Sequence, residues 1–245
     1  MDSLLVVEGV SKCFSRGGEC VVALNDVSFR VPCGEIAMVV GGSLDGKTTL
    51  LQVAAGVERP DRGMVSLGAR ELTGLSDRER AKLLGREIVW IDRYGPGLRV
   101  EVSRFVGWPL TLHGRGRREA ERMAARMLAR VGMQEHASRK WRELSHPRQV
   151  LASLARAFAG DPRLVVVDDL LNGLGSRATE ETIDLIRSLI DEPGHRCGVL
   201  ISVAEMESTV YADRVFSIYK GVVEAMTGLQ ENDADIVPFP RGAAG

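Results

Sequence analysis

The most regular feature of this chain is a series of short hydrophobic runs separated by longer polar stretches. The runs are Ile36–Val40, Ile88–Ile91, Leu164–Val167, Val199–Val203 and Val215–Tyr219. Short apolar runs bounded by polar residues or glycine are typical of strands buried inside a sheet. Apolar residues at helical spacing predict a helix between two of these runs, from about Thr179 to Ile190. Strands alternating with helices predict an α/β fold.

The N-terminal part of the chain has a different pattern. Residues Val21–Val31 alternate between apolar and polar and end at the turn signal Pro32-Cys33-Gly34. Asp61–Gly74 has the composition of turns and short strands. Ser76 followed by Glu79 forms a capping-box pattern, which predicts that a short helix begins there. The opening of the chain is therefore expected to be rich in strands.

The stretch from Asp92 to about Phe158 contains no β-rich run, and its turn residues and helical periodicity predict a helical insertion. Within it, Arg115–Arg126 is basic, but apolar residues recur at helical spacing, which favours an amphipathic helix over a nucleic-acid patch. We therefore expect a core of residues 1–92 and 159–228, a helical subdomain of residues 93–158, and a flexible tail of residues 229–245.

Composition narrows the possible partners and the environment. The 245 residues include 32 basic and 33 acidic residues, for a net charge of −1, so nothing in the overall charge indicates nucleic-acid binding. No apolar stretch approaches the roughly 20 residues that span a bilayer, and the N-terminus lacks a leader pattern, so a membrane role would require a partner chain. Because Cys13, Cys20, Cys33 and Cys197 show no C-x-x-C spacing, we expect reduced packing cysteines of a cytosolic protein.

The clearest chemical motif follows the first hydrophobic run. It fits the pattern G-x-x-x-x-G-K-[ST] and reads Gly41-Gly42-Ser43-Leu44-Asp45-Gly46-Lys47-Thr48, followed by Thr49 in a helical stretch. Backbone N–H groups of such a loop and the helix N-terminus bind phosphate, Lys47 would reach the β- and γ-phosphates, and Thr48 would hold Mg²⁺. The alternative is a tight turn without a ligand. The charge of Asp45 and the bulk of Leu44 are expected to weaken binding.

A second motif lies at the end of the run Leu164–Val167, where Asp168 and Asp169 follow directly. Open parallel sheets bind ligands at the carboxyl ends of their strands. Asp168 is therefore expected to coordinate Mg²⁺, and Asp169 to orient or deprotonate an attacking water. In the structural alternative, the second acid only caps the following turn.

Taken together, these motifs resemble the ATP-binding subunit of ABC transporters over nearly the whole chain. The resemblance is carried by Thr49-Leu50-Leu51, Leu144-Ser145, Leu154–Phe158, Asp161-Pro162-Arg163 and Ala212–Val215. It implies an α/β P-loop NTPase (RecA-like) core with an N-terminal antiparallel β subdomain and a helical insertion. Ala23–Phe29 and Leu75–Arg80 look most like the bacterial subgroup that serves lipoprotein-release, macrolide-export and division-type permeases.

Several residues depart from the pattern of that family. The signature Leu-Ser-Gly-Gly-Gln, which contacts ATP held by the opposite subunit, reads Leu144-Ser145-His146-Pro147-Arg148 here, and Pro147 removes an N–H donor. Ser145 is still expected to cap its helix. Asp169 takes the place of the family's catalytic glutamate, and Asp92 takes the place of its metal-contacting glutamine. Ala204 replaces the switch histidine, and Gly175 replaces a later aspartate. Phe14 matches the aromatic residue that stacks on adenine.

The resemblance implies an ABC-type subunit that binds ATP and Mg²⁺, hydrolyses ATP poorly, and sits peripherally on the cytoplasmic face of the membrane. Its implied partners are a membrane permease and a second nucleotide-binding subunit, which is the same chain or a different one. Two alternatives stay open: a working transport ATPase that uses Asp169 as its base, and a scaffold or regulator without catalysis. The sequence does not reveal the transported substrate or the direction of transport.

Overall fold

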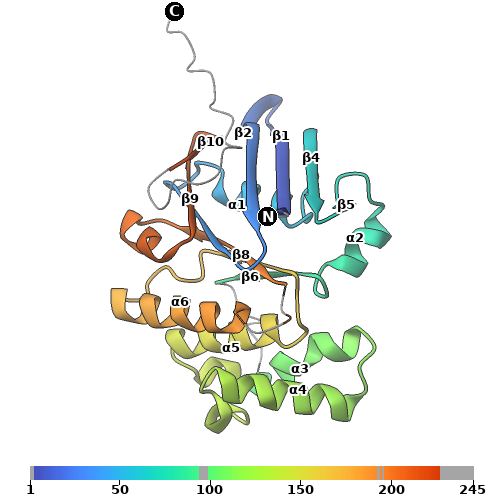
Figure 1. Ribbon diagram of the computed structural model, residues 1–245, viewed down its shortest axis with the longest axis vertical. Coiled ribbons are helices and arrows are strands. Elements are labelled where there is room, and N and C mark those ends of the chain that lie inside the picture. Colours follow the sequence, from blue (N-terminus) through green and yellow to red (C-terminus); the bar gives the residue numbers. More distant parts are fainter. Residues whose placement is uncertain (1–2, 94–98, 192–193, 195, 227–245) are drawn as a thin grey trace, which may run out of the picture.

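The central feature of the fold is a six-stranded sheet (Figure 1). The computed structural model describes residues 3–93, 99–191, 194 and 196–226. The strand order is β10-β9-β3-β8-β7-β6, in which only the β9–β10 pair is antiparallel. The strands are β3 (Ile36–Val40), β6 (Ile88–Asp92), β7 (Leu164–Asp168), β8 (Gly198–Val203), β9 (Arg214–Tyr219) and β10 (Val222–Ala225). Each predicted hydrophobic run forms a strand.

A smaller antiparallel sheet is built from the N-terminal part of the chain. Its strand order is β2-β1-β4-β5, and its strands are β1 (Ser3–Arg16), β2 (Glu19–Pro32), β4 (Arg62–Leu67) and β5 (Arg70–Glu71). The alternating segment Val21–Val31 lies inside β2, as expected. The sequence did not locate β1, which pairs with both β2 and β4.

The two faces of the central sheet are covered by different elements. Ala37 and Val39 of β3 share one hydrophobic cluster with α1 (Lys47–Ala54) and the antiparallel sheet. Ile36 and Met38, which alternate with them, share the other cluster with the remaining long helices. Figure 1 shows the antiparallel sheet above the central sheet, with α5 and α6 below it. Because β3 is buried on both faces, its residues form a continuous apolar run.

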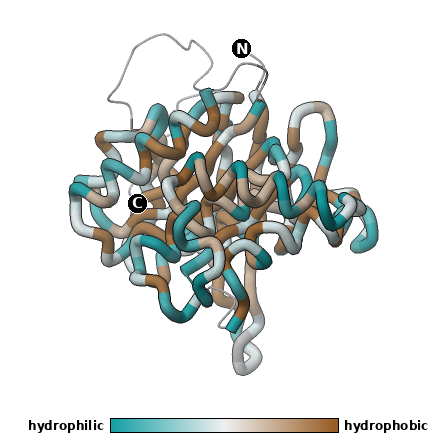
Figure 2. The backbone as a smooth tube through the Cα atoms, turned by 90° about the horizontal axis from the view of Figure 1, so that it is seen from below, coloured by the Kyte–Doolittle hydropathy of each residue, from teal (hydrophilic) through white to brown (hydrophobic). Residues whose placement is uncertain are grey.

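The helices below the sheet come mostly from the middle of the chain. They are α3 (Val102–Leu112), α4 (Arg117–Arg130), α5 (His146–Phe158) and α6 (Ser176–Ile190), with 3-10 turns at Gln134–His136, Trp141–Glu143 and Met206–Tyr211. The basic segment expected to be an amphipathic helix forms α4. Along the whole backbone, polar and apolar stretches alternate (Figure 2). The proposed subdomain boundaries stay a prediction, and residues 229–245 lie outside the described residues.

The structure contains both of the helices whose ends the sequence predicts. The short helix α2 (Asp77–Leu83) begins with a complete capping box, in which Ser76 and Glu79 each satisfy the other's backbone N–H. The predicted helix Thr179–Ile190 ends as expected but begins one turn earlier, at Ser176. In the part of the chain that the structure describes, no helix is long and apolar enough to cross a membrane.

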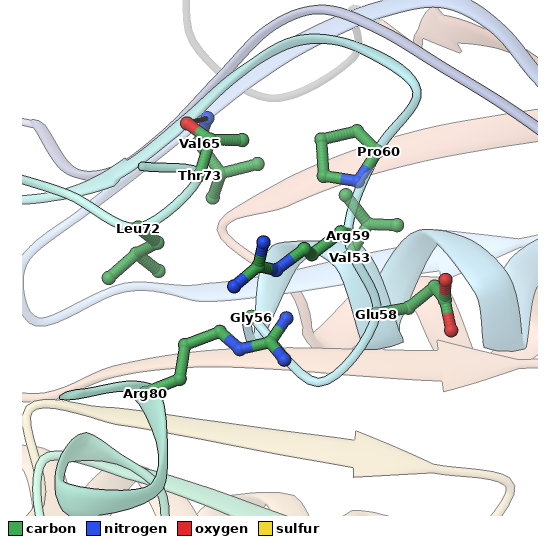
Figure 3. Close-up of a pocket in the computed structure, with 9 residues that line it drawn as sticks. All are labelled: Val53, Gly56, Glu58, Arg59, Pro60, Val65, Leu72, Thr73 and Arg80. Atoms are coloured by element: carbon green, nitrogen blue, oxygen red, sulfur yellow. Dashed lines mark hydrogen bonds between the residues drawn. The ribbon is translucent and has the colours of Figure 1, made fainter. Parts of the chain in front are cut away.

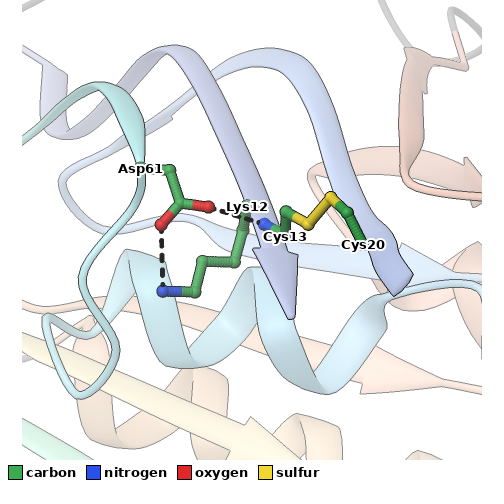
Figure 4. The surroundings of a disulfide bond; sticks show 4 residues. All are labelled: Lys12, Cys13, Cys20 and Asp61. Atoms are coloured by element: carbon green, nitrogen blue, oxygen red, sulfur yellow. Dashed lines mark hydrogen bonds and ion pairs between the residues drawn. A yellow bond between two sulfur atoms is a disulfide. The ribbon is translucent and has the colours of Figure 1, made fainter. Parts of the chain in front are cut away.

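The expectation of four reduced cysteines is wrong for one pair. Cys13 and Cys20 form a disulfide across the β1–β2 hairpin, with their Cα atoms 5.9 Å apart (Figure 4). Antiparallel pairing brings residues seven positions apart together, a separation that a C-x-x-C spacing does not include. Cys33 and Cys197 are free, and burial raises the pKa of the Cys197 thiol to about 12.

Candidate functional site

The glycine-rich loop connects β3 to α1, and its glycines are required by close packing. A Cβ atom at Gly41 would lie 2.5 Å from the carbonyl oxygen of Ile218, and one at Gly46 would lie 2.5 Å from that of Ala23. Gly46 also has a φ of 105° and precedes the first residue of α1. The backbone of the loop is therefore pressed against β2 and β9, where a side chain at either position would not fit.

Lys47 begins α1, and its side chain curls back over the loop. Its ammonium group donates hydrogen bonds to the carbonyl oxygens of Gly41 and Gly42, both at 2.6 Å. Thr48 and Thr49 follow on the first turn of the helix, whose N-terminal N–H groups favour an anion. The loop thus has the lysine, the hydroxyl group and the helix N-terminus that bind a nucleoside triphosphate with Mg²⁺.

The side chain of Asp45 also folds into the loop. Its carboxylate accepts hydrogen bonds from the backbone N–H of Gly42, at 2.7 Å, and of Lys220, at 3.2 Å. The N–H of Gly221 donates to the backbone oxygen of Asp45, at 2.9 Å. A negative charge therefore already occupies a backbone donor of the loop and ties the loop to the β9–β10 turn.

The neighbouring residue in the loop has an unfavourable backbone conformation. Leu44 has a φ of 69°, and its side chain is fully exposed. A residue with a Cβ atom is strained in this left-handed region, which glycine adopts readily. Leu44 therefore carries both backbone strain and an apolar surface at the place where phosphate is expected to approach.

The acidic end of β7 lies beside the end of β6. The parallel register places Asp92 opposite Asp168, so both carboxylates lie at the carboxyl edge of the sheet. Asp168 is buried, with 7% of its surface exposed, and accepts a hydrogen bond from the Ser202 hydroxyl at 2.8 Å. The same hydroxyl accepts the backbone N–H of Asp169 at 2.9 Å. Ser202, which sequence reasoning missed, therefore fixes the backbone and the carboxylate of the acidic pair.

Asp169 is held on both oxygens of its carboxylate. The guanidinium of Arg93 forms an ion pair with Oδ2 at 2.9 Å, and the amide of Asn172 donates to Oδ1. The φ of Asp169 is 56°, a left-handed conformation that is uncommon for a residue with a Cβ atom. Arg93 directly follows Asp92, and that adjacency was the only sequence signal that could have indicated its role.

The third candidate metal ligand, Asp92, also has neighbours. The indole N–H of Trp90 donates to its Oδ2 at 3.4 Å. Burial lowers the pKa of the Arg156 guanidinium on α5, and the negative charge of Asp92 partly opposes that shift. In the described ranges, no group of three His, Cys, Asp or Glu residues is placed to hold a metal ion alone.

The altered signature stands at the start of α5, and Ser145 to Arg148 are all exposed. Ser145 is the N-cap residue, but its side chain makes no capping hydrogen bond, so the expectation that it caps the helix is wrong. An N-cap hydroxyl accepts from the second or third helical N–H, and the second residue here is Pro147, which has none.

The remaining candidate residues lie apart from one another. Phe14 on β1 is partly exposed, with the ammonium group of Lys12 5.2 Å from its ring centre. Ala204 is exposed just after β8, and Gly175 is the N-cap residue of α6. The loop helix α1 and the signature helix α5 pack against opposite faces of the central sheet. One copy of the chain therefore does not bring its own loop and signature together.

Comparison with known protein families places these features in context. The family model of the ABC transporter matches residues 24–172. The chain is 33% identical to the methionine import ATP-binding protein MetN 1 of Rhodococcus jostii over 220 residues, 86% of this chain and 65% of that protein. It is 31% identical to the lipoprotein-releasing system ATP-binding protein LolD of Cereibacter sphaeroides, over 91% of this chain and all of that protein.

A third relative is much longer than this chain. The macrolide export ATP-binding/permease protein MacB of Burkholderia pseudomallei is 29% identical over 98% of this chain, which spans 37% of that protein. Among solved structures, a dimeric post-hydrolysis state of the ATP-binding cassette MJ0796 bound to ADP and Pi aligns with a TM-score of 0.81, at 23% identity. It covers 91% of this chain and 99% of that chain. This likeness confirms the expected fold.

Proposed function

Since this chain belongs to the ABC transporter family of ATP-binding proteins, we propose that it is a subunit that binds Mg-ATP, hydrolyses it poorly, and couples ATP-dependent dimer closure to a separate permease. The observation that carries the proposal is that the carboxylate of Asp169 is already engaged by neighbouring side chains. Its carboxylate is held by Arg93 and Asn172, while the phosphate loop keeps its lysine and its hydroxyl group.

The loop residues account for the binding half of the proposal. Lys47 is poised over the loop and would exchange its two carbonyl partners for phosphate oxygens. Thr48, Asp168 and, at the sheet edge, Asp92 would hold Mg²⁺, which neutralises charge on the phosphates. Ser202 keeps Asp168 in one orientation for that role. Phe14 would stack on adenine, as the resemblance implies.

The poor hydrolysis follows from the surroundings of Asp169. A general base must reach the water that attacks the γ-phosphate, and a displacement of about 1 Å costs roughly a hundredfold in rate. Asp169 is one methylene shorter than the glutamate of the family, and both of its oxygens already accept a donor. Ala204 supplies no side-chain donor to the γ-phosphate at the switch position.

Coupling to transport would then come from closure of a dimer, because a ligand that prefers the closed state shifts the equilibrium without being cleaved. The names of the relatives, which include an ATP-binding/permease protein, support a membrane permease as one partner. The other partner would be a second nucleotide-binding subunit. Such a complex would hold this chain peripherally at the cytoplasmic face of the membrane.

Two other functions have one observation each in their favour. Ser202 donates a hydrogen bond to Asp168 and accepts one from the backbone N–H of Asp169, and this ordering of the acidic pair favours a working ATPase with Asp169 as its base. The carboxylate of Asp45 inside the loop favours a scaffold that binds no nucleotide. The first predicts turnover that Asp169→Asn abolishes, and the second predicts no binding of ATP at all.

The deciding experiment is a calorimetric titration with Mg-ATP, made on the chain alone and in complex with its membrane partner, with phosphate release followed in the same samples. We expect saturable binding that Lys47→Ala removes, together with phosphate release close to background. Release that is lost in Asp169→Asn would establish the working ATPase instead. Absence of binding in the unaltered chain would leave only the scaffold.

A further inference from the structure

A basic pocket lies at the other end of α5 from the signature. It has a volume of about 310 Å³ and is lined by the α2–β6 turn, the C-terminal end of α3 with the residues that follow it, and the end of α5. Its lining consists of Gly85, Arg86, Pro109, Leu110, His113, Gly114, Arg115, Arg156, Ala157 and Gly160. Pockets that bind small molecules begin at about this volume and occur preferentially where parts of a protein meet.

The charged side chains that line this pocket are all basic. Arg86, Arg115 and Arg156 contribute guanidinium groups from three separate elements, His113 adds an imidazole, and no lining residue is acidic. Arg115 forms an ion pair with Glu119 on α4, but both side chains are about half exposed, so this pair contributes little. Three cations gathered without an acid in the wall repel one another unless an anion joins them.

Arg156 is held in place at the pocket by aromatic packing. Its guanidinium carbon lies 5.1 Å from the ring centre of Phe105, which in turn packs against Trp141 at 4.6 Å. Burial lowers the pKa of this guanidinium, and the charge of Asp92 opposes that shift. A partly desolvated guanidinium in a fixed orientation is suited to bidentate binding of an oxyanion.

A second, much smaller hollow on the molecule also has two arginines in its lining (Figure 3). It lies beside Arg59 and Arg80 and holds only about 10 Å³, room for about one water molecule. Both arginines bind the same carboxylate of Asp77, at 2.9 and 2.8 Å. Asp77, whose side chain is largely exposed, thus neutralises these two arginines from outside the lining of the hollow. The described residues that line the larger pocket include no acid.

We propose that the pocket formed by Arg86, His113, Arg115 and Arg156 is a binding site for an anion that carries a pair of carboxylates. The volume accommodates a small dicarboxylate, and the guanidinium planes match carboxylate oxygens. The same chemistry is available from two adjacent acidic side chains of an associated protein. Gly85 lines the pocket, and a Cβ atom there would lie 3.1 Å from the His113 ring and would crowd it.

The test is a titration of the full chain, by calorimetry at low salt, with succinate and separately with the dipeptide Glu-Glu carrying blocked ends. We expect saturable binding of one equivalent, weakened at least tenfold by Arg86→Gln and by Arg156→Gln. Arg117→Gln on α4, an exposed arginine paired with Glu121, is the matched control and should leave binding unchanged. Lys47→Ala should also leave it unchanged, which separates this site from the phosphate loop.

The outcomes distinguish the two sources of the anion. Binding of succinate identifies a free dicarboxylate as the ligand, and binding of the dipeptide alone identifies an acidic protein segment. The proposal is overturned if neither probe saturates, or if Arg86→Gln binds as tightly as the unaltered chain. Arg86 is exposed, so this variant is expected to fold even where Arg156→Gln does not.

Discussion

Single residues in and beside the phosphate loop set the chemistry of the nucleotide site. Asp45 is the first of them, because its carboxylate occupies the N–H of Gly42 and repels phosphate. Replacing it with serine removes the charge and frees that donor. We expect Asp45→Ser to tighten Mg-ATP binding about tenfold, since like-charge repulsion near a protein surface is on the order of a few kcal/mol before screening.

Calorimetry at two salt concentrations would check this prediction. The gain should shrink at high salt, because screening weakens the repulsion in the unaltered chain. Asp184→Ser on α6 is the matched control, because Asp184 is exposed and lies on a helix that packs on the opposite face of the central sheet from α1. Unchanged or weaker binding in Asp45→Ser would show that the hydrogen bonds of Asp45 are needed to shape the loop.

Arg93 is the second such residue, because it forms an ion pair with Asp169, the acid that we propose as the one that would activate water. We expect Arg93→Gln to free one oxygen of Asp169 and to raise phosphate release roughly tenfold or more, within the range that a general base contributes. A phosphate-release assay at saturating ATP measures the effect. The gain should vanish when Asp169→Asn is added, and Arg118→Gln on α4 should produce none. A fall in release would instead mean that Arg93 orients Asp169 productively.

At the scale of secondary-structure elements, the start of α2 offers a test of pH dependence. Hydrogen bonds from Ser76 lower the pKa of Glu79 from its ordinary value of 4.5. Because the folded pKa lies below the unfolded one, this stabilisation is present above about pH 4.5 and is lost as the pH falls through the lowered value. Ser76→Ala should therefore lower the free energy of unfolding at neutral pH and flatten its dependence on acid.

Urea unfolding measured across this pH range would check the prediction. Ser66→Ala in β4 is a suitable control, because that residue takes no part in a cap and should leave the slope with pH unchanged. An identical slope in Ser76→Ala would mean that the capping box persists in the unfolded chain or does not form in solution.

At the scale of the whole molecule, α1 and α5 lie on opposite faces of the sheet, and this arrangement determines which substitutions can restore ATP hydrolysis. The double variant Asp169→Glu with Ala204→His restores family residues only at the ATP site formed by the chain's own phosphate loop. In this family the signature contacts ATP held by another subunit, so the altered signature would still impair the partner's site. We expect little gain from this pair in the isolated chain. Adding His146→Gly, Pro147→Gly and Arg148→Gln should then raise phosphate release by about a hundredfold or more.

Phosphate release and sedimentation, measured together, would separate activity from assembly. The three signature replacements alone serve as the control and should promote an ATP-dependent dimer without fast turnover. Fast release from the loop-side pair alone would show that the altered signature is competent, and would contradict the prediction.

Local spacing explains why much of the site could be predicted from the sequence. The loop, Lys47 and the acidic pair each lie directly at the end of a hydrophobic run, and a strand end is set by its own residues. The error at Ser145 has a local cause as well, since Pro147 removes one of the two N–H groups from which an N-cap hydroxyl can accept. The roles of Ser202, Arg93 and Asn172 could not be found in this way, because polar residues outside a motif carry no spacing signal.

The sequence by itself determined the strands of the hydrophobic runs, the phosphate loop and the family of this protein, because each depends on residues that are neighbours along the chain. Only the tertiary structure decided which groups meet across it. Arg93 reaches Asp169 over 76 positions, Ser202 reaches Asp168 over 34, and Lys220 reaches Asp45 over 175. The basic pocket likewise joins three separate elements. Such contacts follow from strand order and helix packing, which place distant residues together irrespective of their separation in sequence.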